Sequence, residues 1–164
     1  NLSGALGLIV LRAAQAIEAG YSHNEIVAMV SAWVKDTRIF VSVKTLKYMV
    51  RGGRVSQVKG LIAKLLNVNP IVSMDENGAS YIFGKTYSQQ SNMEKVMLHL
   101  SSICKGREIW NYIVLHAQNE DAASWYLLKM KGFTGKKPVA VVNISPVIGA
   151  NAGIGAAAVA LMFK

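Results

Sequence analysis

Apolar residues recur at the spacing of an α-helix over the first part of the chain. From Ala5 to Ala19 they return every three or four positions, and Gly20 follows where a helix would end. Ser22 stands before a second such stretch and Glu25 comes three residues later, which is the spacing of a capping box. The pattern therefore predicts two consecutive helices, the second ending near Asp36.

Strand-like and helix-like stretches mix in the rest of the chain. Runs of β-branched and aromatic residues predict strands over residues 37–43, 70–74, 80–86, 108–116 and 137–144. Helical spacing predicts helices over residues 45–50, 56–66, 88–104 and 119–131, with a last, glycine-opened helix running toward Met162. The fold class that follows is mixed α/β, a small mixed sheet flanked by helices. We place the main boundary after Asp36, between a two-helix segment at 1–36 and an α/β domain at 37–164.

The composition adds a surplus of apolar side chains to this picture. Hydrophobic residues make up 52% of the 164 residues and charged residues only 16%, with 18 Lys and Arg against 9 Asp and Glu. Such a chain is not disordered, and a single cysteine, Cys104, excludes a disulfide scaffold. The surplus has three possible explanations: a membrane segment, a surface for a missing partner, or an enclosed apolar ligand.

The membrane explanation depends on one uncharged stretch, Val139–Phe163. Polar residues and glycines interrupt it, so we interpret it as a strand, a turn at Ser145-Pro146 and a helix, and expect no transmembrane segment. No basic leader precedes Ala5 and no cleavage site follows, so we expect a cytoplasmic protein. The chain begins with Asn1, not methionine, and we expect it to be part of a longer protein.

Metal and nucleophile patterns are weak. The three histidines, His23, His99 and His116, and Cys104 are far apart and fall on different predicted elements. A metal site needs clustered ligands, and a catalytic nucleophile needs a neighbouring base. We therefore expect no metal, no organic cofactor and no catalytic residue.

The glycine run Gly149–Gly155 resembles the nucleotide fingerprint of short-chain dehydrogenases, and Tyr81 and Lys85 have the spacing of their catalytic pair. That fingerprint must begin a βαβ unit followed by a ribose-binding acid, yet no acid follows Asp121. We therefore reject a nicotinamide-dependent reductase. Two interpretations of the glycines stay open: close backbone approach to an anion, or a plain turn.

A second stretch, Arg51-Gly52-Gly53-Arg54, lies in a basic region with seven Lys and Arg and no acid between Asp36 and Asp75. Two arginines around a Gly-Gly turn suit one small anion. The alternatives are a solvated basic face and a nucleic-acid patch. We expect no nucleic acid, because no recognisable binding module accompanies the charge.

Three ordered segments together resemble the bacterial DegV family of fatty-acid-binding proteins, and the likeness extends over the whole chain. The segments are LKYMVRGGRVS at 46–56, LLNVNPI at 65–71 and SPVIGANAGIG at 145–155. The resemblance implies the C-terminal domain of a two-domain DegV-like fold, together with the two preceding helices and without the front domain.

This resemblance implies a carrier, not an enzyme. Such proteins hold a long-chain fatty acid in an apolar tunnel, with its carboxylate near the domain junction, and present it to a fatty-acid kinase or a fused partner domain. Carried onto this chain, the residues expected around the head group come from the two glycine motifs: Arg51, Gly52, Gly53, Arg54, Gly149, Ala150, Asn151 and Gly153.

Five positions depart from the family pattern: Ile154 replaces a usual Pro and Asn69 a usual Lys, and the other three bear on function. Asn151 stands where the family usually has His, so it can donate a hydrogen bond but cannot titrate. Tyr87 and Gln89 occupy the places of an R-x-R that the family associates with kinase docking. These departures motivate an alternative function, an interaction domain that no longer handles lipid.

Overall fold

The computed structural model describes residues 1–54, 68–75 and 77–164, so the helix predicted over residues 56–66 lies outside the described residues. The five predicted strands are present, the last shortened to four residues, and the predicted capping box joins Ser22 and Glu25. In chain order the elements are α1 (Ser3–Glu18), α2 (His23–Asp36), β1 (Thr37–Ser42), α3 (Lys47–Arg51), β2 (Asn69–Met74), β3 (Ser80–Thr86), α4 (Gln89–Ile103), β4 (Ile109–His116), α5 (Glu120–Thr134), β5 (Ala140–Asn143), α6 (Pro146–Ala152) and β6 (Ala157–Phe163).

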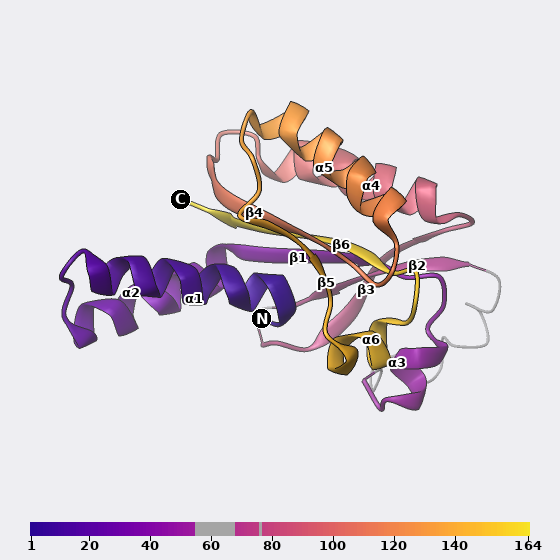
Figure 1. Ribbon diagram of the computed structural model, residues 1–164, viewed down its shortest axis with the longest axis horizontal. Helices are drawn as coiled ribbons and strands as arrows, with labels where there is room; N and C mark the ends of the chain where they lie inside the picture. The colour runs from indigo at the N-terminus through magenta and orange to yellow at the C-terminus, as the bar shows by residue number, and fades with distance from the viewer. Residues whose placement is uncertain (55–67, 76) are drawn as a thin grey trace.

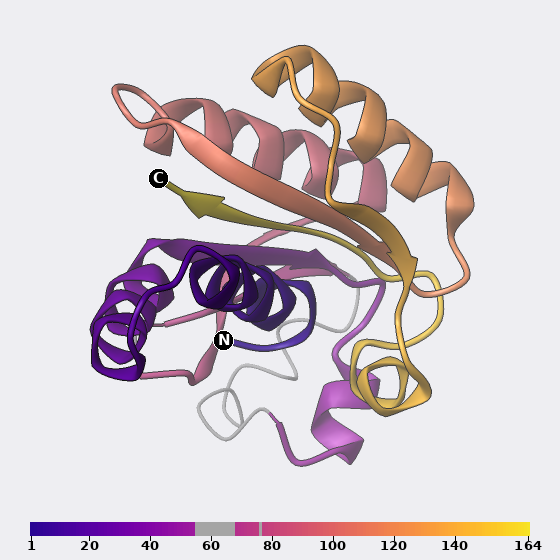
Figure 2. The same ribbon diagram turned by 60° about the vertical axis from the view of Figure 1, so that its left-hand side comes forward.

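A six-stranded sheet organises these elements in the order β3-β2-β1-β6-β4-β5. Strands β4 and β5 run parallel, and every other neighbouring pair runs antiparallel. Helices α4 and α5 cover one face, whereas α1, α2, α3 and α6 lie on the other, which we call the second face (Figures 1 and 2). The predicted mixed sheet flanked by helices is confirmed. None of the described helices is long and apolar enough to cross a bilayer.

The last element is a strand, and the prediction of a helix running toward Met162 is wrong. Residues Ala157–Phe163 are all buried and pair with β1 on one side and β4 on the other. An unbroken apolar run has neither a helical nor a strand period, and its alanines favour a helix in isolation. Pairing with two neighbouring strands decides the outcome. The glycines at 149–155 therefore lead into a strand, unlike a nucleotide fingerprint.

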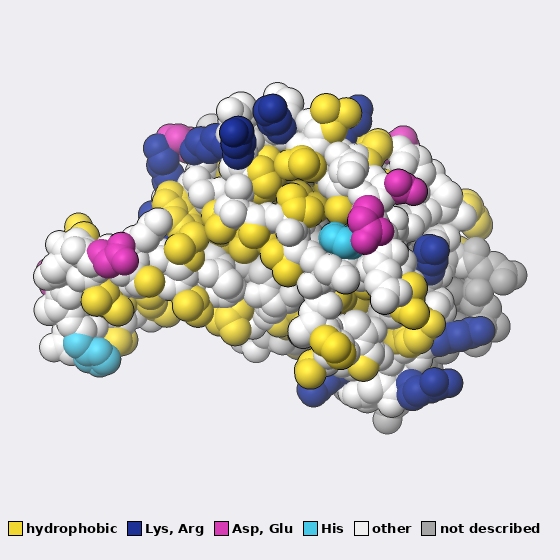
Figure 3. Space-filling view, in the orientation of Figure 1, with side chains coloured by type: hydrophobic (Ala, Val, Ile, Leu, Met, Phe, Trp, Pro, Cys, Tyr) yellow, Lys and Arg dark blue, Asp and Glu magenta, His cyan; other side chains and the backbone are white. Residues whose placement is uncertain are grey.

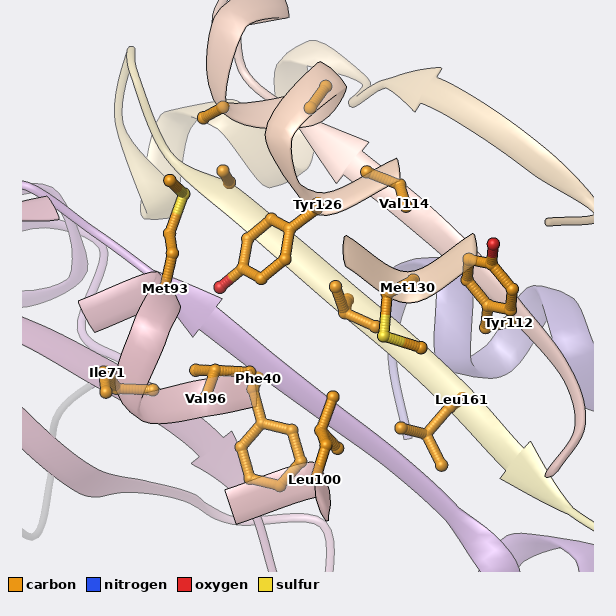
Figure 4. Packing of buried hydrophobic residues seen from close by; sticks show 14 of the residues in the cluster. Phe40, Ile71, Met93, Val96, Leu100, Tyr112, Val114, Tyr126, Met130 and Leu161 are labelled. Carbon is orange, nitrogen blue, oxygen red and sulfur yellow. The ribbon is translucent and has the colours of Figure 1, made fainter. Parts of the chain in front are cut away.

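The two faces of β6 carry side chains of different size. Val159, Leu161 and Phe163 pack beneath α4 and α5 in a core of large residues that includes Phe40 and Tyr126 (Figure 4). The alternate residues Ala158, Ala160 and Met162 belong to a second cluster with residues of α1. Because successive strand residues point to opposite faces, one strand serves both cores. Of the two alanines, Ala158 lines a pocket on the second face, whereas Ala160 is covered within the cluster that includes Ala5 and Leu8.

Arg12 joins the α1–α2 pair to this second face through contacts with two aromatic rings and one backbone carbonyl. Its guanidinium carbon lies 4.9 Å from the centre of the Trp33 ring and 5.0 Å from that of Trp110, and it donates a hydrogen bond to the Phe163 carbonyl oxygen at 3.1 Å. Contacts of a cation with aromatic faces are stabilising, most strongly where water is excluded. The helical pair thus packs on the sheet, and the division of the chain at Asp36 stays a prediction.

His99 makes folding sensitive to pH. Its ring lies 4.4 Å from that of Phe83 and 5.3 Å from that of Phe40, and burial lowers the pKa of His99 below its ordinary value of 6.5. The unfolded chain therefore takes up a proton that the folded chain resists. We expect the contribution of His99 to the free energy of unfolding to be constant above about pH 6.5. This contribution should fall as the pH drops below that value.

Urea denaturation between pH 5 and 8 measures this effect, with His99→Gln as the comparison. The difference in unfolding free energy between wild type and variant should shrink on acidification, because glutamine does not titrate. A difference that stays constant over this range would show that His99 does not contribute to the acid sensitivity.

Candidate functional site

A pocket of about 560 Å³ lies on the second face of the sheet, within the 300–1,000 Å³ typical of small-ligand sites. The first residues of the chain border it, as do α6 and the turn after α3. In Figure 2, α1 and the pair α3 and α6 lie beneath the sheet at separate places. The sheet and the residues next to its strands supply an apolar floor, which includes Ile39, Val41, Val43, Val72, Ala156 and Ala158.

Strand alternation and side-chain size together produce this floor. Val41, Val72 and Ala158 all point to the second face, opposite the large core under α4 and α5. Helix α1 packs on the sheet through Ala5 and Leu8, but it covers only part of this face. The pocket occupies the space between the beginning of α1 and the α3–α6 pair, over small residues of β6.

The Arg-Gly-Gly-Arg segment forms the end of α3 and delivers Arg54 to the pocket. The Arg54 N–H donates to the Met49 carbonyl at 2.9 Å and the Gly53 N–H to the Val50 carbonyl at 3.1 Å, which is a Schellman motif. Gly53 has φ +68°, a left-handed conformation that glycine adopts without steric cost. Gly53 and Arg54 line the pocket, whereas Arg51 is exposed in the last turn of α3 and does not.

The second glycine motif meets the first at the contact between α3 and α6. Gly52 lies so close to Asn151 that a Cβ atom there would approach Asn151 Cγ to 3.2 Å and overlap its Oδ1. Gly153, with φ +82°, lies directly against the ring of Tyr48. Asn151 uses one amide hydrogen within α6, donating to the Val147 carbonyl at 3.1 Å. Two segments far apart in sequence therefore form one corner of the pocket.

Of the eight residues predicted for the head group, three line the pocket: Gly53, Arg54 and Asn151. The other five are not among its described lining residues: Arg51, Gly52, Gly149, Ala150 and Gly153. Gly52 and Gly153 instead allow the close approach of α3 and α6. The structure thus brings the two glycine motifs together and separates three lining residues from the others, while the role of these eight residues at a head group stays a prediction.

Sequence reasoning missed most of the apolar lining. Val147 and Ile148 of α6 border the pocket, as do Ser73 and Ser80 from β2 and β3. The alternation of β1 identifies Ile39 and Val41 as belonging to one face, but it does not say which face is left uncovered. That information comes from how the helices pack.

The described lining of the pocket includes one arginine and no acidic residue. Arg54 is the only Lys, Arg, Asp or Glu among the described lining residues. Figure 3 shows Lys and Arg side chains at this end of the molecule, near the part that Figure 1 labels α3, and others along the side of α5. An apolar pocket with one guanidinium at its rim is suited to an amphiphile with an anionic head, because guanidinium binds carboxylate through charge-assisted hydrogen bonds.

Comparison with known proteins identifies the family. Residues 1–164 match the family described as "Uncharacterised protein, DegV family". The chain belongs to the DegV family. A DegV domain-containing protein of Clostridium acetobutylicum is 32% identical over 158 residues, covering 95% of this chain and 56% of that protein. One from Mycoplasmopsis pulmonis is 31% identical over 149 residues, covering 90% of this chain and 51% of that protein.

Solved structures of DegV proteins share the fold. DegV of Bacillus subtilis, described as a fatty acid binding protein, has a TM-score of 0.84 and 27% identity, covering 98% of this chain and 57% of that one. A DegV protein of Thermus thermophilus, whose description is fatty acid binding, has a TM-score of 0.85 and 26% identity, with the same coverage. This chain thus spans about half the length of the relatives that it matches.

The α3–α6 contact predicts a contrast between two glycines of the same motif. At Gly153 an alanine would have to adopt φ +82° and displace the Tyr48 ring, so we expect Gly153→Ala to destabilise the fold by about 1–3 kcal/mol. At Gly149, inside α6, no atom of the described residues beyond the helix's own backbone lies within 4 Å of the added methyl, and Gly149→Ala should be neutral or stabilising by up to about 1 kcal/mol. Urea denaturation measures both variants, and equal stabilities would contradict the described contact.

Proposed function

We propose that this chain is the acyl-binding half of a cytoplasmic fatty-acid carrier. The observation that carries the proposal is the apolar pocket on the second face, with Arg54 as the only Lys, Arg, Asp or Glu among its described lining residues. Membership of the DegV family and the fatty-acid-binding relatives of Bacillus and Thermus support the same ligand class. The acyl chain lies along the sheet floor, and the carboxylate lies at the α3–α6 corner.

The hydrophobic effect is large enough to drive such binding. Removing one methylene from water contributes about 0.8 kcal/mol, so fourteen methylenes give roughly 11 kcal/mol before association costs of about 4–15 kcal/mol. The protein therefore needs an apolar lining and only a few polar groups for the head. Arg54 supplies charge, and Asn151, whose amide donates to the Val147 carbonyl at 3.1 Å, adds a neutral polar group at the same corner.

A front domain, which the relatives' greater length allows, completes the site in this proposal. The outer face of α1 exposes large apolar side chains at Leu6, Val10 and Ile17, which are 48%, 60% and 65% exposed. Val147 of α6, beside the pocket, is 75% exposed. Hydrophobic side chains also appear along the α1–α2 pair in Figure 3. We propose that the front domain covers these residues and adds contacts to the carboxylate.

The carrier would pass its ligand to a fatty-acid kinase, which phosphorylates the carboxylate using a cytoplasmic nucleotide. Arg51 and Arg54 are both exposed, so two cationic side chains at the α3–α6 corner could contact such a partner. The family's R-x-R is replaced by Tyr87, which is 89% exposed, and by Gln89, whose side chain turns inward. Partner docking here would therefore use other basic residues around α3.

The pair Arg54→Ala and Arg51→Ala tests this proposal. Both variants lose one positive charge from the same turn, but only Arg54 lines the pocket. We expect Arg54→Ala to weaken hexadecanoate binding about 10- to 100-fold, the equivalent of about 1.5–3 kcal/mol for a hydrogen bond to a charged group. Arg51→Ala should change the Kd by less than about twofold.

Displacement of a fluorescent fatty acid, at constant ionic strength, measures these Kd values, first for the chain alone and then for the protein with its front domain. Equal losses in the two variants would contradict a head group at Arg54. Absence of binding in both wild-type proteins would overturn the carrier proposal and favour an interaction domain.

A further inference from the structure

We propose that Gln89 and Asn119 are positioning residues, which hold the loop after α6 so that Asn151 and Arg54 together select a carboxylate head group. This inference rests on the proposed function. It assigns a role in ligand selection to two side chains that line no part of the described pocket.

The two amides converge on one backbone oxygen. Gln89 Nε2 donates to the Gly155 carbonyl oxygen at 2.5 Å, and Asn119 Nδ2 donates to the same oxygen at 2.7 Å. Asn119 Nδ2 also lies 3.3 Å from Gln89 Oε1, so the side chains support each other. Both lone pairs of the carbonyl oxygen therefore have a donor.

Further bonds make this junction a rigid reference point. The Gly155 N–H donates to the Ala117 carbonyl at 2.7 Å, and the Ala117 N–H donates to the Ala156 carbonyl at 2.9 Å. Asn119 caps α5 by accepting from the Ala122 N–H, and its own N–H donates to His116 Nδ1 at 3.1 Å. The beginnings of α4, α5 and β6 and the end of β4 thus meet at Gly155.

Gly155 connects the two parts of the candidate site. On one side of it are Gly153, against Tyr48, and Asn151, against Gly52. On the other side Ala156 begins the pocket floor. A shift of the Gly155 carbonyl would therefore move Asn151 relative to Arg54, and a charge-assisted contact depends steeply on such geometry. The apolar floor, which is held by strand pairing, would move much less.

Gln89, which stands at a position of the family's R-x-R, directs its side chain into the protein. The DegV resemblance led us to expect an arginine at this position, but Gln89 uses its amide inside the protein. Its neighbour Gln90 is exposed and donates to Glu94 at 2.9 Å within α4. Gln90 therefore serves as a matched control for any change at Gln89.

The test compares affinities for hexadecanoate and hexadecan-1-ol, which share the acyl chain but differ in head-group charge. Gln89→Glu replaces the donor by a carboxylate that repels the Gly155 carbonyl, and Gln89→Met removes the donor without adding charge. We expect both variants to lose at least about tenfold in affinity for hexadecanoate and less than about twofold for hexadecan-1-ol. Gln90→Glu should retain the wild-type ratio of the two affinities.

Circular dichroism and thermal melting establish that each variant is folded, and Gln89→Met provides the measurement if Gln89→Glu does not fold. Equal losses for acid and alcohol, or no loss for either, would overturn the positioning role while leaving the carrier proposal intact. A wild-type protein that binds neither ligand would instead reject the carrier proposal, and this inference with it.

Discussion

Strand β6 holds the two halves of the molecule together, because it pairs with β1 on one side and β4 on the other and is buried on both faces. On one face Val159, Leu161 and Phe163 complete the large core under α4 and α5. On the other face Ala158 and Ala160 occupy little volume. Large side chains fill the face under α4 and α5, whereas on the second face the described residues include both a packed cluster with α1 and a pocket lined by Ala158. The pocket depends on this asymmetry.

The close approach of α3 and α6 places polar side chains at one corner of the pocket. The Schellman turn at Gly53 brings Arg54 to the pocket, and the packing of Gly153 against Tyr48 brings α6 and Asn151 to the same corner. Main-chain geometry, not side-chain reach, therefore sets the place of the only Arg, Lys, Asp or Glu side chain in the described lining. The planar guanidinium fork is pre-organised, so Arg54 would lose less side-chain freedom per hydrogen bond formed with an anion.

Local signals in the sequence predicted much of this fold. The capping box at Ser22 and the β-branched run at residues 37–43 each have a short-range physical cause, and both elements are present. Strand β6 lacked such a signal, because its uninterrupted apolar run is equally consistent with a buried helix. Its identity depends on pairing with β1 and β4, which is a long-range property.

The candidate site also combines residues that local motifs identify with residues that only long-range packing brings in. Arg54 and Asn151 were found through motifs, but their meeting was implied only by resemblance to the DegV family. The apolar floor was missed, because strand alternation separates Val41 from Phe40 without revealing which of the two faces holds the pocket. The contribution of Gln89 was also hidden, since its partner is a backbone carbonyl far along the chain.

Intermolecular nuclear Overhauser effects between a bound fatty acid and methyl-labelled protein test most directly that the second face holds the acyl chain. With hexadecanoate, we expect cross-peaks from the chain methylenes to the methyl groups of Ile39, Val41 and Val72, which line the pocket. Cross-peaks confined to Val96 and Leu100, in the core under α4 and α5, would contradict this placement.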